Sequence, residues 1–174
     1  MSPNITNLTL QIYKLLNDEK IPLYAFFDDN ILSSVSFKKL QQLPFFVKYT
    51  FKHIIRQNGC KEVFENFSEL ISYYISIDNS YYSLSRHEIL LLNNTGLKSE
   101  IELYKIEEIT EKIVDVLYYF FDEFDLKLNS IKLNFSRADN NLILYLKLTD
   151  STFLLNDIKT GKSLNLDEIA EKIK

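Results

Sequence analysis

The spacing of the apolar residues changes near residue 125, and this change constrains the fold more than any other feature of the sequence. Before it, apolar residues recur every three to four positions, as in amphipathic helices. After it, they alternate with polar residues, as in half-buried strands. A run of helices followed by a run of strands predicts an α+β chain rather than regularly alternating strands and helices.

The helical part is predicted to be a bundle that extends from residue 1 to about 126. Its first helix is expected to begin with Ser2 as the N-cap and Pro3 in the first turn, and to end before Pro22. Residues 21–35 fit either a short strand or a helical turn, and we favour the turn. Further helices are expected over 44–58, 61–75, 85–92 and 99–124.

Two of these helices carry capping signals at their starts. Ser85 is followed three residues later by Glu88, and Ser99 is followed by Glu102 in the same way. This pattern is typical of a capping box, in which each side chain bonds the backbone of the other. The helix that begins at Ser99 is the longest expected, on the order of 39 Å at 1.5 Å per residue.

The second part, residues 127–174, is predicted to be a three-stranded antiparallel β-meander followed by a short helix. Its strands are expected over 130–137, 142–150 and 152–158, joined by short turns. The final helix is expected over 166–173, with Asn165 as its cap. We expect this small unit to pack against the helical domain, residues 1–126, as one compact body.

Composition indicates a reducing, cytoplasmic setting. The only cysteine, Cys60, cannot form a disulfide within the chain, and the N-terminus lacks the pattern of a signal peptide. No apolar run reaches the roughly 20 residues of a membrane span. The abundance of Ile, Asn, Lys, Tyr and Phe fits an AT-rich genome.

Charge is distributed unevenly along the sequence. Residues 30–61 contain six Lys or Arg side chains and no acid, whereas residues 99–125 contain nine acids and two lysines. Within the basic run, the expected helix over 44–58 would form one ridge of cations beside another of rings. We predict that this face binds a partner, and its residues are Lys48, Lys52, Arg56, Phe45, Tyr49 and His53.

These features lead to the hypothesis of a non-enzymatic adaptor or regulatory subunit that docks an acidic protein, or a second copy of itself, on the basic helix. The first alternative is a nucleic-acid-binding subunit of a replication or RNA-guided assembly, since cations beside rings suit single strands. The second alternative is an enzyme of unrecognised type. We expect no cofactor, no metal and no small-molecule ligand.

Motifs that could indicate catalysis are weak. Gly161, Lys162 and Ser163 resemble the end of a phosphate-binding loop, but the first glycine of that motif is replaced by Asn156. A turn that closes a hairpin explains these residues better. Cys60 and the two histidines have no spacing that recommends a nucleophile and its base.

Overall fold

The computed structural model describes residues 2–27, 30–36, 38–51, 71–78, 80–92 and 95–174. Nine strands among these residues form one mixed sheet. The strands are β1 (Leu23–Phe27), β2 (Asn30–Ser33), β3 (Leu40–Thr50), β4 (Ile71–Ile77), β5 (Ser80–Leu84), β6 (Leu126–Ala138), β7 (Asn141–Leu146), β8 (Phe153–Asp157) and β9 (Ser163–Leu164).

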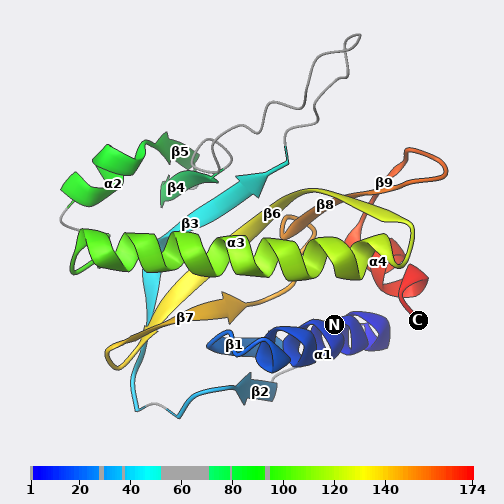
Figure 1. The fold of residues 1–174 in the computed structure, drawn as a ribbon, viewed down its shortest axis with the longest axis horizontal. Helices are drawn as coiled ribbons and strands as arrows, with labels where there is room; N and C mark the ends of the chain where they lie inside the picture. Colours follow the sequence, from blue (N-terminus) through cyan, green and yellow to red (C-terminus); the bar gives the residue numbers. More distant parts are fainter. Residues whose placement is uncertain (1, 28–29, 37, 52–70, 79, 93–94) are drawn as a thin grey trace, which may run out of the picture.

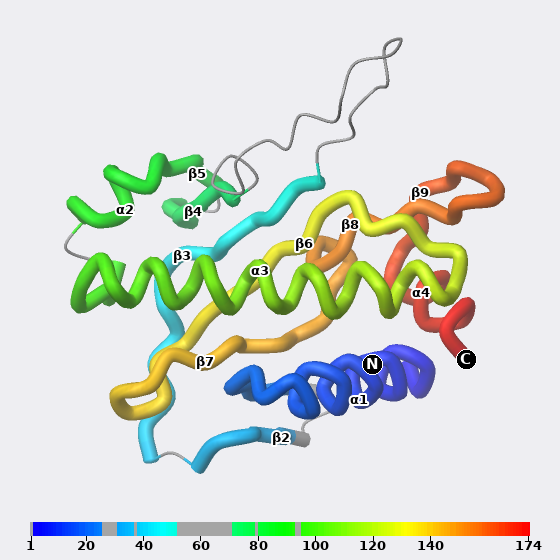
Figure 2. Tube along the Cα trace, in the orientation of Figure 1, coloured from blue at the N-terminus to red at the C-terminus, as the bar shows by residue number. Residues whose placement is uncertain are grey.

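The long strand β6 lies at the centre of the sheet. The order across the sheet is β2-β1-β7-β6-β3-β4-β5, and β8 pairs with β6 and β9. The pairing of β1 with β7 is parallel, and the other pairings among these strands are antiparallel. Because β3 comes from the first half of the chain and β6 from the second, the sheet joins segments that are far apart in sequence (Figure 2).

Helices cover one face of this sheet (Figure 1). They are α1 (Pro3–Asp18), α2 (Arg86–Leu91), α3 (Glu100–Asp122) and α4 (Leu166–Lys172). The apolar stripes of α1 and α3 are buried in the core. Helix α3 packs on β6 and β3, whereas α1 packs on β1 and beside α3 and α4. With 23 residues, α3 is the longest helix described, and none of the described helices is long and apolar enough to cross a membrane.

The predicted N-terminal helical bundle is wrong. A helix was expected to begin at Pro44, but residues 40–50 form the strand β3. The register between β3 and β6 shifts between Gln42 and Phe46, so Pro44 lies at a β-bulge or similar irregularity of the ladder. A bulge tolerates proline because the missing N–H is not needed for the ladder. The rest of the expected 44–58 helix, after Phe51, lies outside the described residues.

Two other segments were expected to be helical or irregular and are strands. Residues 71–75, placed at the end of the expected 61–75 helix, belong to β4, and Ser80–Leu84 form β5 in a hairpin with it. Asp78 takes the positive φ of 50° that such a tight turn favours. Residues 23–27 and 30–33 form β1 and β2 rather than a helical turn.

The predicted meander is also wrong, because β8 does not follow β7 in the sheet. Both strands pair with β6, β7 along residues 134–138 and β8 along residues 126–131. The division of the chain at residue 126 stays a prediction. The strands of the second part share the sheet with β1, β3 and β4 of the first.

Most of the helix caps are confirmed. Ser2 caps α1, and both Ser85 with Glu88 and Asn165 with Glu168 form complete capping boxes. Ser99 makes no capping hydrogen bond through its side chain. Its expected partner, Glu102, instead accepts a hydrogen bond of 2.6 Å from the backbone N–H of Lys98.

Low pH is expected to weaken the contact between α4 and the sheet. Asp157 of β8 binds Lys172, and its carboxylate also accepts a 2.7 Å hydrogen bond from the N–H of Thr160. The hydrogen bond from Lys172 is the main reason that the pKa of Asp157 lies well below its usual range, and the N–H of Thr160 contributes as well. Because the folded pKa is the lower one, the ionised carboxylate stabilises the fold above the unfolded pKa, and this contribution is lost as the pH falls.

We therefore expect Asp157→Asn to lower the melting temperature at pH 7. The difference from the parent protein should shrink once the pH falls below about 4, where the unfolded chain binds the proton. Thermal unfolding at the two pH values measures this. Asp122→Asn, at an exposed position on α3, is the matched control and should show no such pH dependence. A constant difference across pH would contradict the assignment.

Candidate ligand-binding site

The face of the sheet opposite α3 carries the candidate site. Side chains of β3 alternate between the two faces. Val47 and Tyr49 are buried in the core on the helix side, so Phe46 and Lys48 lie on the other side. The cross-strand register then determines their neighbours: Lys48 pairs with Lys132 and Ser72, and Phe46 pairs with Asn134 and Tyr74.

This face contains two adjoining hollows. One, of about 380 Å³, is lined by residues of β3, β4, β5 and β6 and by the β7–β8 connection, among them Lys48, Ser130 and Asp150. The other, of about 470 Å³, lies on the side of Asn134. Phe46, Tyr81 and Lys132 line both, so the two hollows meet at these three side chains. A ligand with a ring and more than one polar group could occupy both.

Two lysines stand side by side on this face. Lys48 and Lys132 are direct partners in the β3–β6 ladder, and both are half-buried. No carboxylate in the described part of the chain lies within ion-pair distance of either ammonium group. Like charges directly opposite each other destabilise a sheet. The pair therefore forms a positive site whose charge is not balanced within the described residues.

Aromatic rings surround Lys132. The rings of Phe46 and Tyr74 are stacked, with centroids 5.1 Å apart, and Tyr81 meets Phe46 edge-on at 5.2 Å. The Nζ of Lys132 lies 3.9 Å from the centroid of Phe46 and 4.8 Å from that of Tyr81. Such cation–π contacts hold the ammonium group without neutralising it. We call Phe46, Tyr74 and Tyr81 the aromatic wall.

The aromatic wall is supported from behind. Tyr73 points to the helix side of β4, where its hydroxyl donates to Glu107 of α3. Burial and this contact raise the pKa of Tyr73 above its ordinary value. Arg86 of α2 donates to the same carboxylate at 3.0 Å and to Glu100 at 2.8 Å. These bonds tie β4 and α2 to α3, and thereby position Tyr74 on the opposite face.

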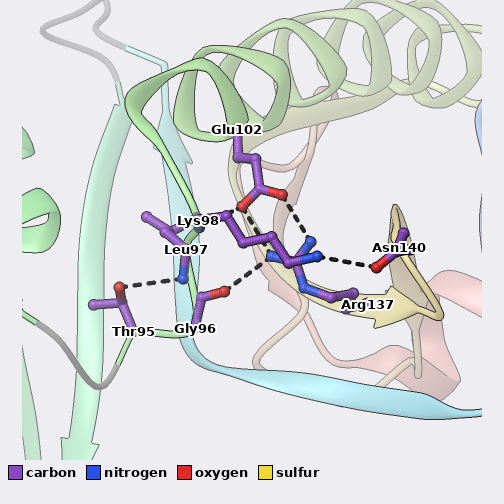
Figure 3. A network of polar contacts seen from close by, with 7 residues as sticks. All are labelled: Thr95, Gly96, Leu97, Lys98, Glu102, Arg137 and Asn140. Carbon is purple, nitrogen blue, oxygen red and sulfur yellow. Dashed lines mark hydrogen bonds and ion pairs between the residues drawn. The ribbon is translucent and has the colours of Figure 1, made fainter.

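A second network, shown in Figure 3, fixes β6 to the beginning of α3. Glu102 accepts hydrogen bonds of 2.7 and 2.8 Å from the two terminal nitrogens of Arg137, a side chain that is only 7% exposed. One of these nitrogens also donates to the carbonyl of Gly96 at 2.9 Å. The hydrogen bond from Arg137 is the main reason that the pKa of Glu102 lies below its ordinary value.

Gly96 is required in this network for a geometric reason. Its φ of 74° lies in the left-handed region, which residues with a Cβ rarely adopt. A Cβ at this position would also lie 3.2 Å from Cδ2 of Leu43. The turn that presents the Gly96 carbonyl to Arg137 therefore needs glycine, and the network anchors the strand that carries Lys132.

The site does not resemble a metal centre. Asp150 is the one carboxylate among the residues that line the two hollows, and its Oδ1 accepts a 2.9 Å hydrogen bond from the N–H of Leu166. Nowhere in the described part of the chain do three His, Cys, Asp or Glu side chains gather in a way that could hold a metal ion.

Three of the residues predicted to bind a partner are described by the structure, and these three do not share one surface. Phe45 and Tyr49 are each only 3% exposed and belong to the core, and Lys48 lies on the opposite face of β3. Lys52, His53 and Arg56 lie outside the described residues. Docking of an acidic protein or of a second copy on this segment stays a prediction.

Several residues of the hollows were missed by the sequence analysis. Lys132 occupies an outward position in the alternating run SIKLNF, so its exposure on one sheet face could have been inferred. What the sequence does not show is that this strand pairs with residues 40–50, which brings Lys132 beside Lys48. Tyr74 and Tyr81 were missed because β4 and β5 were not recognised as strands.

Sequence comparison identifies similar proteins of known activity. The chain is 27% identical over 169 residues to the phosphoribosylaminoimidazole-succinocarboxamide synthase of Sulfurisphaera tokodaii. The aligned region covers 90% of this chain and 67% of that enzyme. It is 27% identical over 114 residues to the corresponding synthase of Persephonella marina, and this aligned region covers 66% of this chain and 47% of that enzyme. The chain thus spans about two thirds of one relative and about half of the other. No protein-family model matches it.

Solved structures show the same fold. The phosphoribosylaminoimidazole-succinocarboxamide synthase of Ehrlichia chaffeensis superposes with a TM-score of 0.73 and 21% identity, over 98% of this chain and 78% of that one. The SAICAR synthetase of Pyrococcus horikoshii OT3 superposes with a TM-score of 0.70 and 23% identity, over 96% of this chain and 80% of that one. A SAICAR synthetase in complex with ADP superposes with a TM-score of 0.72 and 21% identity, over 97% of this chain and 78% of that one. At this identity, the likeness shows that the chain has the SAICAR synthetase fold.

These findings contradict the predicted function. The similar sequences and structures are synthetases, that is, enzymes, and not adaptors or regulatory subunits. The prediction of a non-enzymatic protein was wrong because the basic, aromatic segment was interpreted as one face of a helix. The residues of this segment that lie in β3 are divided between the core and the face that bears the two hollows.

Proposed function

We propose that this chain acts as a synthetase of the phosphoribosylaminoimidazole-succinocarboxamide type and binds its ligand on the face that bears the two hollows. The observation that carries the proposal is the similarity to the Sulfurisphaera tokodaii synthase over 90% of the chain. The chemistry of the hollows supports it. The compound in the enzyme's name has a phosphoryl group, an imidazole ring and a succinyl unit with two carboxylates.

The residues of the site are suited to such a compound. The ammonium groups of Lys48 and Lys132 attract phosphoryl or carboxylate oxygens, and Tyr81, the exposed ring of the aromatic wall, offers a surface for an imidazole. The hydroxyl of Ser130 and the amide of Asn134 add polar partners at either end. One structural neighbour was solved with ADP, and we include a nucleoside diphosphate among the ligands to be tested.

The protein's own groups would contribute binding and orientation. Two half-buried cations beside aromatic rings act on anionic groups more strongly than they would in bulk water. Forming the carboxamide joins an amine nitrogen, which loses a proton, to a carboxyl carbon, which loses one of its oxygens as the leaving group. Holding the two reactants together removes much of the entropic barrier. A cytoplasmic setting, expected from the single cysteine, is part of this proposal.

Binding of SAICAR to the purified chain tests the proposal directly. We expect isothermal titration calorimetry to detect binding, and Lys132→Ala to weaken it by about 10- to 100-fold, since a hydrogen bond to a charged group contributes roughly 1.5–3 kcal/mol. Lys127→Ala, at an exposed position on the same strand outside both hollows, should bind as the parent does.

Synthesis is tested separately from binding. Expression of the chain in bacteria that lack their own SAICAR synthase should restore growth without added purine, and the Lys132→Ala variant should fail to restore it. Absence of both SAICAR binding and growth in the parent protein would overturn the proposal. Binding without growth would limit the function to ligand recognition.

A further inference from the structure

The pairing of Lys48 with Lys132 is the least explained feature of the candidate site. Their Cβ atoms are expected to be about 5 Å apart, because the residues are direct partners in an antiparallel ladder. Both are half-buried, so solvent screens the repulsion between them less than it would at a fully exposed site. A third group that carries negative charge would turn this repulsion into attraction.

The surroundings of the pair leave room for such a group. Lys132 is held over the rings of Phe46 and Tyr81, and an ammonium group has three donors. Lys48 and Lys132 both line the hollow of about 380 Å³, and Ser130 and Ser151 line it as well. Only Lys132 lines the neighbouring hollow. The point at which both cations are available therefore lies in the first hollow.

The carboxylate content of the hollows indicates how an anion would be bound. Divalent cations that carry phosphate groups into a protein site are usually held by one or two carboxylates. Asp150 is the one acid that lines either hollow, and it already accepts a hydrogen bond from the N–H of Leu166. The two lysines are better placed to contact the anion themselves.

We propose that Lys48 and Lys132 form an oxyanion subsite, which binds a phosphoryl or carboxylate group of the ligand directly and without a bridging divalent cation. The subsite belongs to the same face as the proposed function and specifies which residues hold the charged end of its ligand. The aromatic wall fixes Lys132 and excludes water from one side of the subsite. The ring of the ligand would then extend toward Asn134 and the second hollow.

Titration with inorganic phosphate, pyrophosphate and succinate tests the subsite apart from the rest of the ligand. We expect the parent protein to bind at least one of these anions, with an affinity that falls as the salt concentration rises and does not change on addition of a chelator. Stronger binding of phosphate or pyrophosphate would assign the subsite to the phosphoryl group. Stronger binding of succinate would assign it to the succinyl unit.

Lys48→Ala is the decisive variant, and Lys127→Ala is its matched control. We expect Lys48→Ala to bind the anion at least 10-fold more weakly and Lys127→Ala to bind it as the parent does. Without ligand, Lys48→Ala should melt at or above the temperature of the parent, because it relieves the repulsion with Lys132. A merely structural lysine would lower the melting temperature instead.

The outcomes separate this inference from the proposed function. Anion binding that is unchanged in Lys48→Ala, or that a chelator abolishes, would overturn the subsite even if SAICAR binds. Anion binding that depends on both lysines, together with no binding of SAICAR, would support the subsite and overturn the proposed ligand. Absence of any anion binding by the parent protein would also overturn the subsite.

Discussion

Glu102→Ala should destabilise the protein by about 3–5 kcal/mol, because it leaves the buried guanidinium of Arg137 without its counter-charge. Arg137 would keep its bond to the carbonyl of Gly96, but a neutral oxygen does not replace a carboxylate. For a chain of this length, the loss corresponds to a melting temperature lower by about 6–20 °C. Urea unfolding followed by circular dichroism measures the free energy directly.

Two further variants make this prediction specific. Glu108→Ala, at an exposed position on α3, should change the free energy of unfolding by less than about 0.5 kcal/mol. The double variant Glu102→Leu with Arg137→Met should recover most of the stability, since well-packed apolar side chains often replace a buried ion pair without loss. A single Glu102→Ala variant as stable as the parent would show that the pair is not buried as described.

Phe121→Ala should destabilise the protein by a similar amount, about 3–5 kcal/mol, through the cavity that it leaves. Phe121 lies in the last turn of α3, is fully buried, and meets the ring of Phe153 at a centroid distance of 5.1 Å. Its removal would separate α3 from β8. Chemical denaturation gives the free energy, and Phe121→Leu should lose less because it keeps more of the buried volume.

Tyr119→Ala is the control for this aromatic truncation. Tyr119 is two residues away on the same helix and is 69% exposed. We expect its replacement to change the free energy of unfolding by no more than about 0.5 kcal/mol. If the two truncations had equal effects, the loss at Phe121 would reflect a change in helix propensity rather than a buried cavity.

The helices that the structure describes could be predicted from the sequence because their signals are local, although two further helices, expected over 44–58 and 61–75, are strands where they are described. Ser85 with Glu88, and Asn165 with Glu168, define helix starts within four residues of chain, and the structure confirms both capping boxes. The alternation of Ile131, Leu133 and Phe135 likewise predicted the middle of β6. Each of these patterns depends on one element only and needs no knowledge of what packs against it.

Strand β3 could not be predicted because both of its faces are apolar in part. Phe45, Val47 and Tyr49 face the core, but Phe46 is also only 8% exposed, since Tyr74 and Tyr81 cover it. The alternation of apolar and polar residues is therefore lost, and the remaining pattern also fits a helix. Pro44 added to the error, because a bulge and a helix start both accept proline.

The candidate site depends on pairings between distant parts of the sequence. The sequence analysis placed Lys48 on a helical ridge with Lys52 and Arg56, whereas the structure pairs it with Lys132. The two lysines are brought together by the register of β3 on β6, which no local pattern specifies. The aromatic wall needs a further pairing, that of β4 with β5, to bring Tyr81 to Phe46.

The alternation of Tyr73 and Tyr74 has a consequence for how variants of this protein should be selected. Neighbouring residues of one strand serve different partners: Tyr73 is bonded to Glu107 behind the sheet, and Tyr74 is stacked on Phe46 in front of it. A library restricted to residues that line the hollows would leave out Arg86 and Glu107. Randomising these two together with the aromatic wall would let selection adjust both the shape of the recess and the support that determines it.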